Sequence, residues 1–462
     1  GMSRYAQYSH GPLLGFIAAW ANWISLVTLV PMEAVAAVQY MSSWPWSWAN
    51  WTKNFIKNGD ITFEGIGVVF IFMLIFTMIN FWSVKIMTHF TNLISIFKIL
   101  LPTLTIVTLI CSGFHEHNFG TNIHEFMPYG SRSIFEATSV SGIIMSYDAF
   151  QTIINMGGEL KNPRKNIVRG VLISMLITAA IYIMLQVTFI GAVEPSMLAK
   201  VGWHGIDFTS PFADLAILMG INWLVILLYL DAFVSPFGTG VAFVATASRA
   251  LAAMTHTRHL PKWLGRINQK YMIPRYAMAT DLILAVILVS LFRNWNLLAT
   301  VITASTLIAY LTGPVTVMTL RKIRPDLARP FKPRYMPWLA PIAFVLTSLA
   351  IYWSMWPTTI QVILVIALGL PIYFYYEIRY QHSDLKKQLH NCWWMIGYLI
   401  FMSFMSYIGS NGFGGQNWIK YPFDFVVIIV VSLLFYYWGV KSGRDQLDPY
   451  AEHIVQNKNK QK

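Results

Sequence analysis

Charged residues are scarce in this chain of 462 residues. Asp, Glu, Lys and Arg together make up 11% of it, whereas hydrophobic residues make up 56% and aromatic residues 15%. Soluble globular domains carry about 25% charged residues, so a water-soluble fold of this composition would expose a very large apolar surface. The composition therefore excludes an ordinary soluble domain and indicates an all-α, polytopic membrane protein.

Cysteine is nearly absent, and the motifs of several enzyme classes are missing. Cys111 and Cys392 are the two cysteines of the sequence, and the topology derived below places them on opposite membrane faces, which disfavours a disulfide. The sequence has no His-Glu-x-x-His, no Gly-x-Ser-x-Gly and no P-loop motif. We therefore expect no enzymatic activity, no bound metal, and no cofactor other than a coupling proton.

Long apolar runs, in contrast, are abundant. About twelve of them approach or exceed the roughly 20 residues that a helix needs to cross a bilayer. They cover roughly residues 11–41, 64–84, 89–113, 133–157, 168–193, 218–248, 276–292, 296–320, 337–356, 359–378, 393–412 and 422–440.

The basic excess of the chain follows its predicted topology. The formal net charge is +13. If the amino terminus is cytoplasmic, most of the 33 lysines and arginines fall in inner loops, and those in outer loops are Lys53, Lys57, Arg132, Lys200, Arg293 and Lys420. This bias obeys the positive-inside rule. We therefore expect an integral plasma-membrane protein with both termini in the cytoplasm and no nucleic-acid partner. The oligomeric state is not indicated.

Five ionisable side chains interrupt the apolar runs. A charge at mid-bilayer costs roughly 2.5–3.5 kcal/mol on the insertion scale, and such residues usually face a protein interior or a water-filled path. They mark routes for substrates, ions or protons, so transport is the leading interpretation. The five residues are Glu33, Lys98, Asp148, Asp231 and Asp281.

Asp148 is the strongest single candidate. It follows Tyr147, precedes Ala149 and Phe150, and lies midway along its run, between the helix-weakening pairs at 141–142 and 157–158. Broken helices at mid-membrane expose backbone groups that transporters use to hold substrates and ions. We expect the Asp148 carboxylate to contact a substrate ammonium or to carry a proton. The alternative is a structural carboxylate that accepts hydrogen bonds from backbone amides freed at the break.

Lys98 has apolar neighbours on both sides and lies too deep to reach the inner interface easily. It is either a titrating proton site or a fixed cation standing where a sodium ion would otherwise bind. The structural alternative is an ion pair with Asp231 or another acid. We expect Ser235 and Thr239 of a facing helix to complete a proton-coupling site with Lys98.

The remaining intramembrane acids carry weaker expectations. Asp231 lies one turn before the segment Ser235–Gly240, in which a proline and two glycines predict a second broken helix. It either pairs with Lys98 or relays a proton. Glu33, in the outer half of its run, is expected to line an outer vestibule on the substrate path. Asp281 lies near the inner start of its run, within reach of the interface, and a structural role is favoured.

Three stretches resemble the amino acid–polyamine–organocation superfamily of permeases over essentially the whole chain. Residues 159–167 read Glu-Leu-Lys-Asn-Pro-Arg-Lys-Asn-Ile after the Asp148 run. Residues 247–254 read Ala-Ser-Arg-Ala-Leu-Ala-Ala-Met and lead to Leu260-Pro261. Tyr310 precedes Leu320-Arg321, Pro325 and Arg329-Pro330-Phe331. Their order, spacing and placement resemble the superfamily, and the span count is similar to that of its prokaryotic aspartate–proton symporter branch.

The resemblance implies an inverted-repeat fold of five plus five spans within a single transmembrane domain covering residues 1–462. Residues 11–113 would be the remainder of the first repeat and 133–320 the second. Four further spans would follow at 337–440, and a cytoplasmic tail at 441–462. The run at 133–157 would then be the sixth span, and Phe150 the aromatic residue after its break. Lys98 would match a fifth-span lysine that replaces sodium in some proton-coupled members.

Two departures from the superfamily pattern stand out. Residues 1–5 resemble the loop before the third span, so we expect two spans, and with them a glycine-rich break that holds the substrate carboxylate, to be missing from this sequence. A fragment and a misplaced start both fit this pattern. In addition, Ala149 stands where the family has a glycine at the sixth-span break.

The sequence thus predicts a secondary active amino-acid transporter driven by protons, with aspartate or glutamate as possible substrates. Substrate would bind near Tyr147, Asp148, Ala149 and Phe150, with Glu33 on its path. Lys98, Asp148, Asp231, Ser235 and Thr239 would couple the proton. Two alternatives stay open: an exchanger of an amino acid for an amine with the same fold, and a membrane receptor or partner subunit that binds substrate without moving it.

Overall fold

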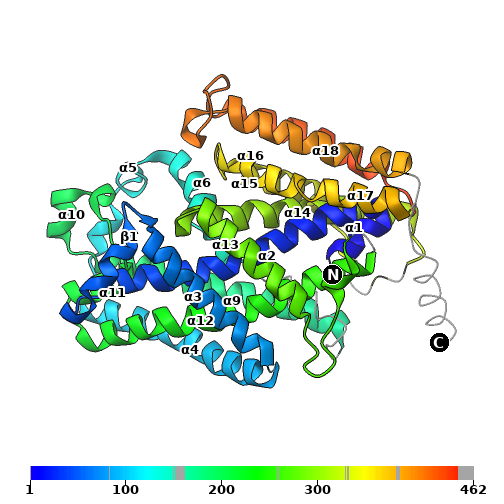
Figure 1. Ribbon diagram of the computed structural model, residues 1–462. Coiled ribbons are helices and arrows are strands. Elements are labelled where there is room, and N and C mark those ends of the chain that lie inside the picture. The colour runs from blue at the N-terminus through cyan, green and yellow to red at the C-terminus, as the bar shows by residue number, and fades with distance from the viewer. Residues whose placement is uncertain are drawn as a thin grey trace.

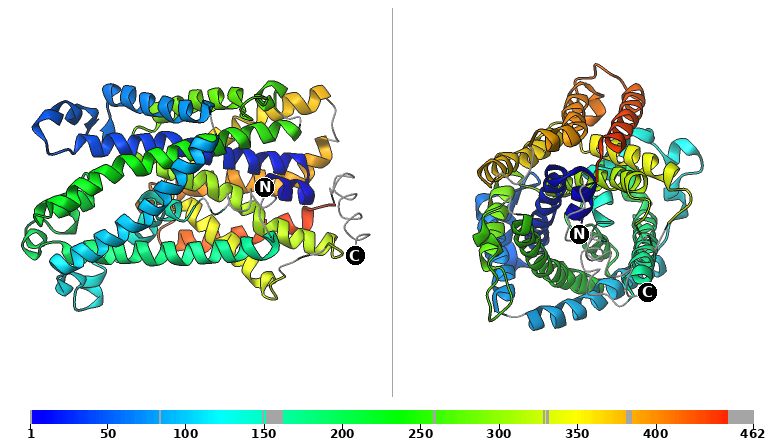
Figure 2. Two further views of the ribbon diagram at one scale, coloured as in Figure 1. Left: turned by 90° about the horizontal axis from the view of Figure 1, so that it is seen from below. Right: turned by 90° about the vertical axis from the view of Figure 1, so that its right-hand side faces the viewer.

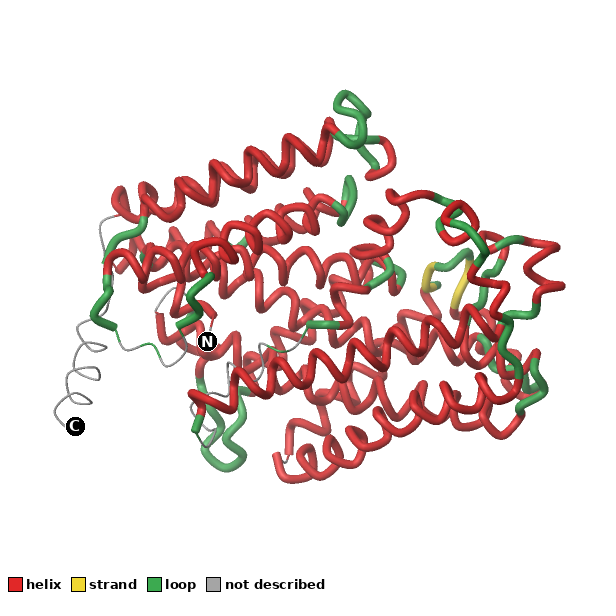
Figure 3. The backbone as a smooth tube through the Cα atoms, turned by 180° about the vertical axis from the view of Figure 1, so that it is seen from behind, coloured by secondary structure: helices red, strands yellow, loops and turns green. Residues whose placement is uncertain are grey.

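The structure, a computed structural model, describes residues 2–82, 84–148, 150, 162–257, 260–327, 329, 332–380 and 385–445. These residues form an all-α protein whose long helices run roughly alongside one another (Figure 1). Helix dominates the trace from end to end, and the two strands lie together near one end of the helices (Figure 3). The predicted fold class, an all-α polytopic protein, is confirmed.

The described helices in the first half of the chain are α1 (Met2–His10), α2 (Pro12–Ser42), α3 (Phe63–Trp82), α4 (Val84–Ser112), α5 (Ile123–Phe126), α6 (Gly130–Val140), α7 (Ile143–Ser146), α9 (Pro163–Ala192), α10 (Pro195–Val201) and α11 (Pro211–Leu218). The later helices are α12 (Asn222–Met254), α13 (Arg275–Leu291), α14 (Trp295–Ile323), α15 (Met336–Tyr352), α16 (Thr358–Ala367), α17 (Leu370–Tyr380), α18 (Leu385–Ile408) and α19 (Phe423–Ser442).

Short elements join these helices. The 3-10 helices are η1 (Ser47–Phe55), η2 (Glu116–Phe119), η3 (Trp203–Gly205), η4 (Thr255–Thr257), η5 (Lys262–Gly265) and η6 (Asn411–Phe413). The strands β1 (Ile56–Lys57) and β2 (Asp60–Ile61) pair antiparallel. Asn58 and Gly59 connect them with φ angles of 54° and 81°. Asn and Gly accept positive φ at low cost, so this dipeptide suits a tight hairpin.

Eight helical segments among the described residues are long and apolar enough to cross a membrane. They belong to α2, α3, α4, α9, α12, α14, the α16–α17 segment and α19. The other predicted spans are largely helical in their described residues, and the run at 133–157 is divided between α6 and α7. Of these, α13 and α15 have 17 residues each, slightly fewer than a perpendicular crossing needs.

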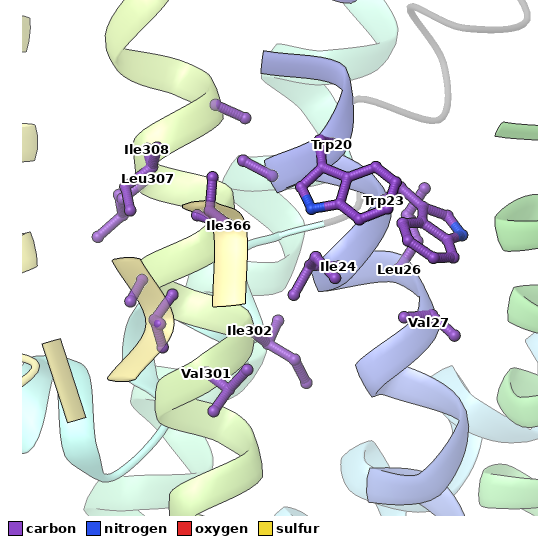
Figure 4. Close-up of a cluster of buried hydrophobic side chains, with 14 of the residues drawn as sticks. Trp20, Trp23, Ile24, Leu26, Val27, Val301, Ile302, Leu307, Ile308 and Ile366 are labelled. Atoms are coloured by element: carbon purple, nitrogen blue, oxygen red, sulfur yellow. The ribbon is translucent and has the colours of Figure 1, made fainter. Parts of the chain in front are cut away.

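The helix α2 lies in the interior of the protein. It packs most extensively against α12 and α14. Viewed along the helices, α1 and α2 lie inside a ring formed by the others, and α18 and α19 project at one edge (Figure 2). In the core, Ile24 of α2 lies on the side toward Ile302 of α14, whereas Trp20 and Trp23 lie on the other side of α2 (Figure 4). α2 and α14 thus form one packed unit that can hold polar side chains in fixed positions.

The prediction of a broken helix at Ser235–Gly240 is wrong. α12 runs unbroken from Asn222 to Met254 with Pro236 inside it. Its glycines serve close packing instead, because a Cβ at Gly238 would overlap Ile94 of α4, and a Cβ at Gly240 would overlap Phe76 of α3. Small residues at helix contacts let transmembrane helices approach closely. The segment therefore brings α4 and α3 close to α12.

The interruption predicted at residues 141–142 is present. α6 ends at Val140, and α7 begins at Ile143 after Gly142, whose φ is 77°. Two features disfavour any side chain at residue 142. Positive φ strains most residues, and a Cβ would lie 2.9 Å from Cη2 of Trp295. α7 ends at Ser146, one residue before Tyr147. The predicted weak point at residues 157–158 lies outside the described residues.

Candidate functional site

The carboxylate of Asp148 is bound by two hydroxyl groups of α14. Thr306 Oγ1 donates to Oδ2 at 2.9 Å, and Tyr310 Oη donates to Oδ1 at 2.6 Å. Thr306 and Tyr310 are four residues apart, so they share one face of the helix. Hydrogen bonds to an ionised group are stronger than those between neutral groups. Both of these donors come from another helix.

A third helix joins this cluster through Ser25 of α2. Ser25 Oγ lies 2.6 Å from Thr306 Oγ1, and both side chains are buried. Since Thr306 donates its only hydroxyl hydrogen to Asp148, Ser25 must be the donor to Thr306. A continuous chain of hydrogen bonds thus runs from α2 through α14 to the residue that follows α7. A shift of α2 against α14 would alter the Ser25–Thr306 bond, and with it a hydroxyl group that binds Asp148.

Aromatic rings surround the carboxylate. The rings of Phe150 and Tyr310 have centroids 5.1 Å apart, and those of Tyr147 and Tyr182 have centroids 5.7 Å apart. These spacings are typical of attractive ring pairs. The predicted substrate residue Ala149 lies outside the described residues. The rings bring α9, which carries Tyr182, into the site.

A cavity of about 250 Å³ opens beside these residues. Its walls come from the end of α7, from the segment after it and from α9. They include Ser146, Tyr147, Asp148, Phe150, Ser174, Met175 and Thr178. Small-molecule sites combine an apolar wall with a few converging polar groups. This cavity has hydroxyl groups, one carboxylate and aromatic rings, and among the described residues that line it none is basic.

Lys98 lies in contact with Thr239 across the α4–α12 interface. The Lys98 ammonium donates to Thr239 Oγ1, and that hydroxyl donates in turn to the backbone carbonyl of Ser235 at 3.0 Å. Ser235 therefore takes part through its main chain, one turn earlier on α12. The described residues contain no ion pair between Lys98 and an acid, so the alternative of a Lys98–Asp231 salt bridge is not observed.

Two acids lie close enough to Lys98 to interact with its charge. These are Glu33 of α2 and Asp231 of α12. Asp231 Oδ1 is buried and has no hydrogen-bond partner among the described residues. Glu33 also acts electrostatically on Tyr182. It belongs to the neighbourhood of Lys98 and does not line the 250 Å³ cavity.

The predicted residues therefore form two clusters joined by a tyrosine. One cluster contains Asp148, and the other contains Lys98 with Thr239, Glu33 and Asp231. Tyr182 stands between them, since its ring meets Tyr147 and its charge environment includes Glu33. Asp281 belongs to neither cluster. It is only 4% exposed, so it does not reach the interface as the sequence led us to expect.

Sequence reasoning missed Ser25, Thr306 and Tyr182, and gave Tyr310 no role at the site. Hydroxyl residues are common in membrane helices, where they bond to the preceding turn, so their presence alone marks no site. One signal was available: Thr306 and Tyr310 share a face of an apolar helix at the four-residue spacing. Only the fold brings that face to Asp148.

Comparison with known proteins points to one family. The amino acid permease family matches residues 1–365. The glutamate/serine transporter AimA of Bacillus subtilis (strain 168) is 48% identical over 443 residues, covering 96% of this chain and 82% of the relative. The aspartate-proton symporter of the same organism is 33% identical over 448 residues, covering 96% and 84%. Its branched-chain amino acid permease BcaP is 24% identical over 393 residues, covering 82% and 78%.

Proposed function

Because the chain belongs to the amino acid permease family, we propose that it is a secondary active transporter that moves an amino acid together with a proton across the bacterial inner membrane. Both termini would lie in the cytoplasm, as the charge bias of the loops favours. Substrate would cross chemically unchanged, with no cofactor beyond the coupling proton. Residues 11–113 and 133–320 would act as the two repeats that move against each other.

We infer that Asp148 and its surroundings hold the substrate. The carboxylate is fixed by Thr306 and Tyr310 and borders the cavity, so its charge suits a substrate ammonium group. Tyr147 and Phe150 would pack against the aliphatic part of the substrate, and Glu33 would lie along its path. We include Ala149 in the proposed binding segment because it lies between Asp148 and Phe150 in the sequence.

The coupling site is centred on Lys98 in this proposal. The observation that carries it is the contact of the Lys98 ammonium with Thr239, with no acid ion-paired to Lys98 in the part of the chain that the structure describes. A protonated amine donates to Thr239 and attracts Glu33 and Asp231, whereas a neutral amine loses that attraction. Gain or loss of one proton would therefore tighten or loosen α4 against α12. Asp148 or Asp231 would be a second titrating group, with Ser235 and Thr239 orienting the lysine.

The substrate class follows from the relatives together with the site. One relative is named as a glutamate/serine transporter and another as an aspartate-proton symporter. We therefore propose that this chain transports one or more of these amino acids. Asp148 would repel a second carboxylate, so the side chain of an acidic substrate would point away from it, toward the side of Lys98. This orientation explains how a cavity without a basic lining residue could still accept an acidic amino acid.

Uptake by purified protein in proteoliposomes tests the proposal. A panel of radiolabelled glutamate, aspartate, serine, leucine and lysine is offered with an acidic exterior, with and without sodium. We expect accumulation of glutamate, aspartate or serine that follows the pH gradient and ignores sodium. Sodium-driven uptake that is indifferent to pH would reject proton symport. Counterflow that needs no proton gradient would identify an exchanger, and binding without any flux would identify a receptor.

A further inference from the structure

A second buried acid lies away from both clusters, at the contact between α13 and α2. Asp281 of α13 is 4% exposed, and its Oδ1 accepts a hydrogen bond from Nε1 of Trp23 at 2.9 Å. Its Oδ2 is buried and has no partner among the described residues. Trp23 lies beside Trp20 on one side of α2, away from the face that meets α14 (Figure 4). Asp281 is thus half satisfied, by a neutral donor.

No cation balances this carboxyl group among the described residues. α13 packs against α2, α3, α12 and η5. The charged and titratable side chains of these elements and of α13 itself are Glu33, Tyr40, Glu64, Tyr229, Asp231, Arg249, Lys262, Arg275 and Tyr276. Among the described residues none of them forms an ion pair with Asp281, and Trp23 is its hydrogen-bond partner. Arg275 is engaged elsewhere, with the carbonyl and ring of Phe81.

The protonated form fits this environment better than the ionised form. An ionised carboxylate that is buried without a counter-cation is far more costly than a neutral acid in the same place. Since Oδ1 accepts from Trp23, the proton belongs on Oδ2. A neutral acid keeps the Trp23 bond and removes the uncompensated charge.

A groove lies on the other side of Trp23 from this acid. The groove has a volume of about 520 Å³. Its lining includes Trp20, Trp23, Thr280, Leu251, Leu264 and Tyr375. Thr280 is the neighbour of Asp281, and Leu264 belongs to η5, between α12 and α13. Trp23 therefore stands between the acid and the groove, and a change of its rotamer would open the acid to the groove.

The same stretch of α2 connects Asp281 to the substrate site. Trp23 is two residues before Ser25, which bonds to Thr306 and through it to Asp148. A displacement of α2 that alters the Ser25 contact would also move Trp23. We propose that Asp281 is a proton-binding site of the transport cycle, which holds its proton while Trp23 covers it and exchanges that proton through the groove when α2 shifts. This inference rests on the proposed proton symport.

Infrared difference spectroscopy of the full chain in lipid tests the proton itself. The wild type, Asp281→Asn and Asp424→Asn are compared, with and without glutamate, aspartate or serine. Asp424 is a matched control, because it is fully buried but both its oxygens accept hydrogen bonds, from Tyr352 and from the Phe425 amide. We expect a carbonyl band of a protonated carboxylic acid that responds to substrate, is lost in Asp281→Asn and persists in Asp424→Asn.

Transport measurements separate this role from a structural one. In Asp281→Asn vesicles we expect substrate counterflow to persist while the number of protons moved per substrate falls. In Trp23→Phe vesicles, which keep the acid and remove its donor, we expect the pH dependence of uptake to shift. An Asp281→Asn protein with the wild-type proton-to-substrate ratio, or with an unchanged infrared spectrum, would overturn the inference.

Different results would overturn the proposed proton symport and the inference about Asp281. If the wild type moves substrate without protons, the proposed symport and this inference both fall. If the wild type moves protons and Lys98→Ala abolishes their movement while Asp281→Asn leaves it intact, only the inference about Asp281 falls. Should Asp281→Asn not fold, the Trp23→Phe variant decides, since a wild-type pH profile in that variant would contradict the covering role of Trp23.

Discussion

Two helices of nearly equal hydropathy occupy opposite environments in this protein. The most apolar stretches of α2 and α9 have mean hydropathies of 1.9 and 2.1. In α2, 94% of that stretch is buried inside the protein, whereas in α9 the buried share is 0%. Hydropathy therefore predicts that a segment crosses a membrane, but it does not predict where in the bundle the segment lies.

The buried side chains of α2 include small and hydroxyl residues. Ala18, Ala21 and Ala34 are fully buried, and such small residues let neighbouring helices approach closely. Ser25 and Thr28 are fully buried too, and each has a hydrogen-bond partner. In a medium without water, such partners must come from the protein. α2 thus serves as the frame of the site, while α9 supplies one wall of the cavity.

The largest expected difference between the two sides of the cavity concerns uptake. Asp148→Asn removes the charge that Thr306 and Tyr310 bind, and hydrogen bonds to a charged group are worth about 1.5–3 kcal/mol. If substrate binding relies on that charge, uptake falls roughly ten- to hundred-fold. Ser174→Ala on the α9 wall leaves uptake close to wild type. Initial rates at equal protein content measure both, and equal rates in the two variants would contradict the assigned role of Asp148.

A matched pair of substitutions tests the difference in packing. Ala21→Leu on α2 forces three extra carbon atoms into a filled interior and should destabilise the protein by about 1–3 kcal/mol. Ala180→Leu on the exposed face of α9 meets no such barrier, so its unfolding temperature should match wild type. Thermal unfolding in detergent compares them. A similar loss in both variants would show that α9 is as tightly enclosed as α2.

Glycine replacements sharpen the comparison within the buried side. Gly240→Ala places a methyl group against Phe76, so overpacking should outweigh the gain in helix propensity and cost about 1 kcal/mol net. Gly313→Ala on α14 meets nothing within 4 Å and should stabilise by about 0.5–1 kcal/mol. The unfolding temperatures should move in opposite directions, and a shift of equal sign would refute this account of the α12 glycines.

The smallest effect is expected at the exposed end of α14. Arg324 binds Asp326 at 2.9 Å, and this lowers the pKa of the Asp326 carboxyl. A lowered folded-state pKa means that the stabilisation is present above the unfolded pKa of about 3.9 and is lost as pH falls through the folded value. Asp326→Asn should therefore reduce stability slightly at neutral pH, with no difference from wild type in strong acid. The difference should shrink in high salt.

Much of the fold was predictable from the sequence, because apolar length is a strong signal in a membrane protein. The run at 11–41 predicted α2, and the run at 168–193 predicted most of α9. The proline and glycines of residues 235–240 were misread, since the same residues weaken an isolated helix and improve the packing of a buried one. Which function they serve depends on Ile94 and Phe76, which are far away in sequence.

The site was predictable only in part. Isolated charges such as Lys98 and Asp148 stand out in an apolar run, so their positions were found from the sequence. Their partners are hydroxyl residues on other helices, and these look like ordinary helix residues until the helices are packed. Asp281 was placed near an interface because its depth was counted along one helix. Its burial comes from α2, which the sequence of α13 does not describe.

Proton flux measured together with substrate flux tests the central claim most directly. Vesicles free of sodium and loaded with a pH-sensitive dye receive glutamate, aspartate or serine. For the wild type we predict that substrate entry acidifies the lumen, and for Lys98→Ala that this acidification is abolished. Substrate entry without acidification in the wild type, or full acidification in Lys98→Ala, would contradict the account.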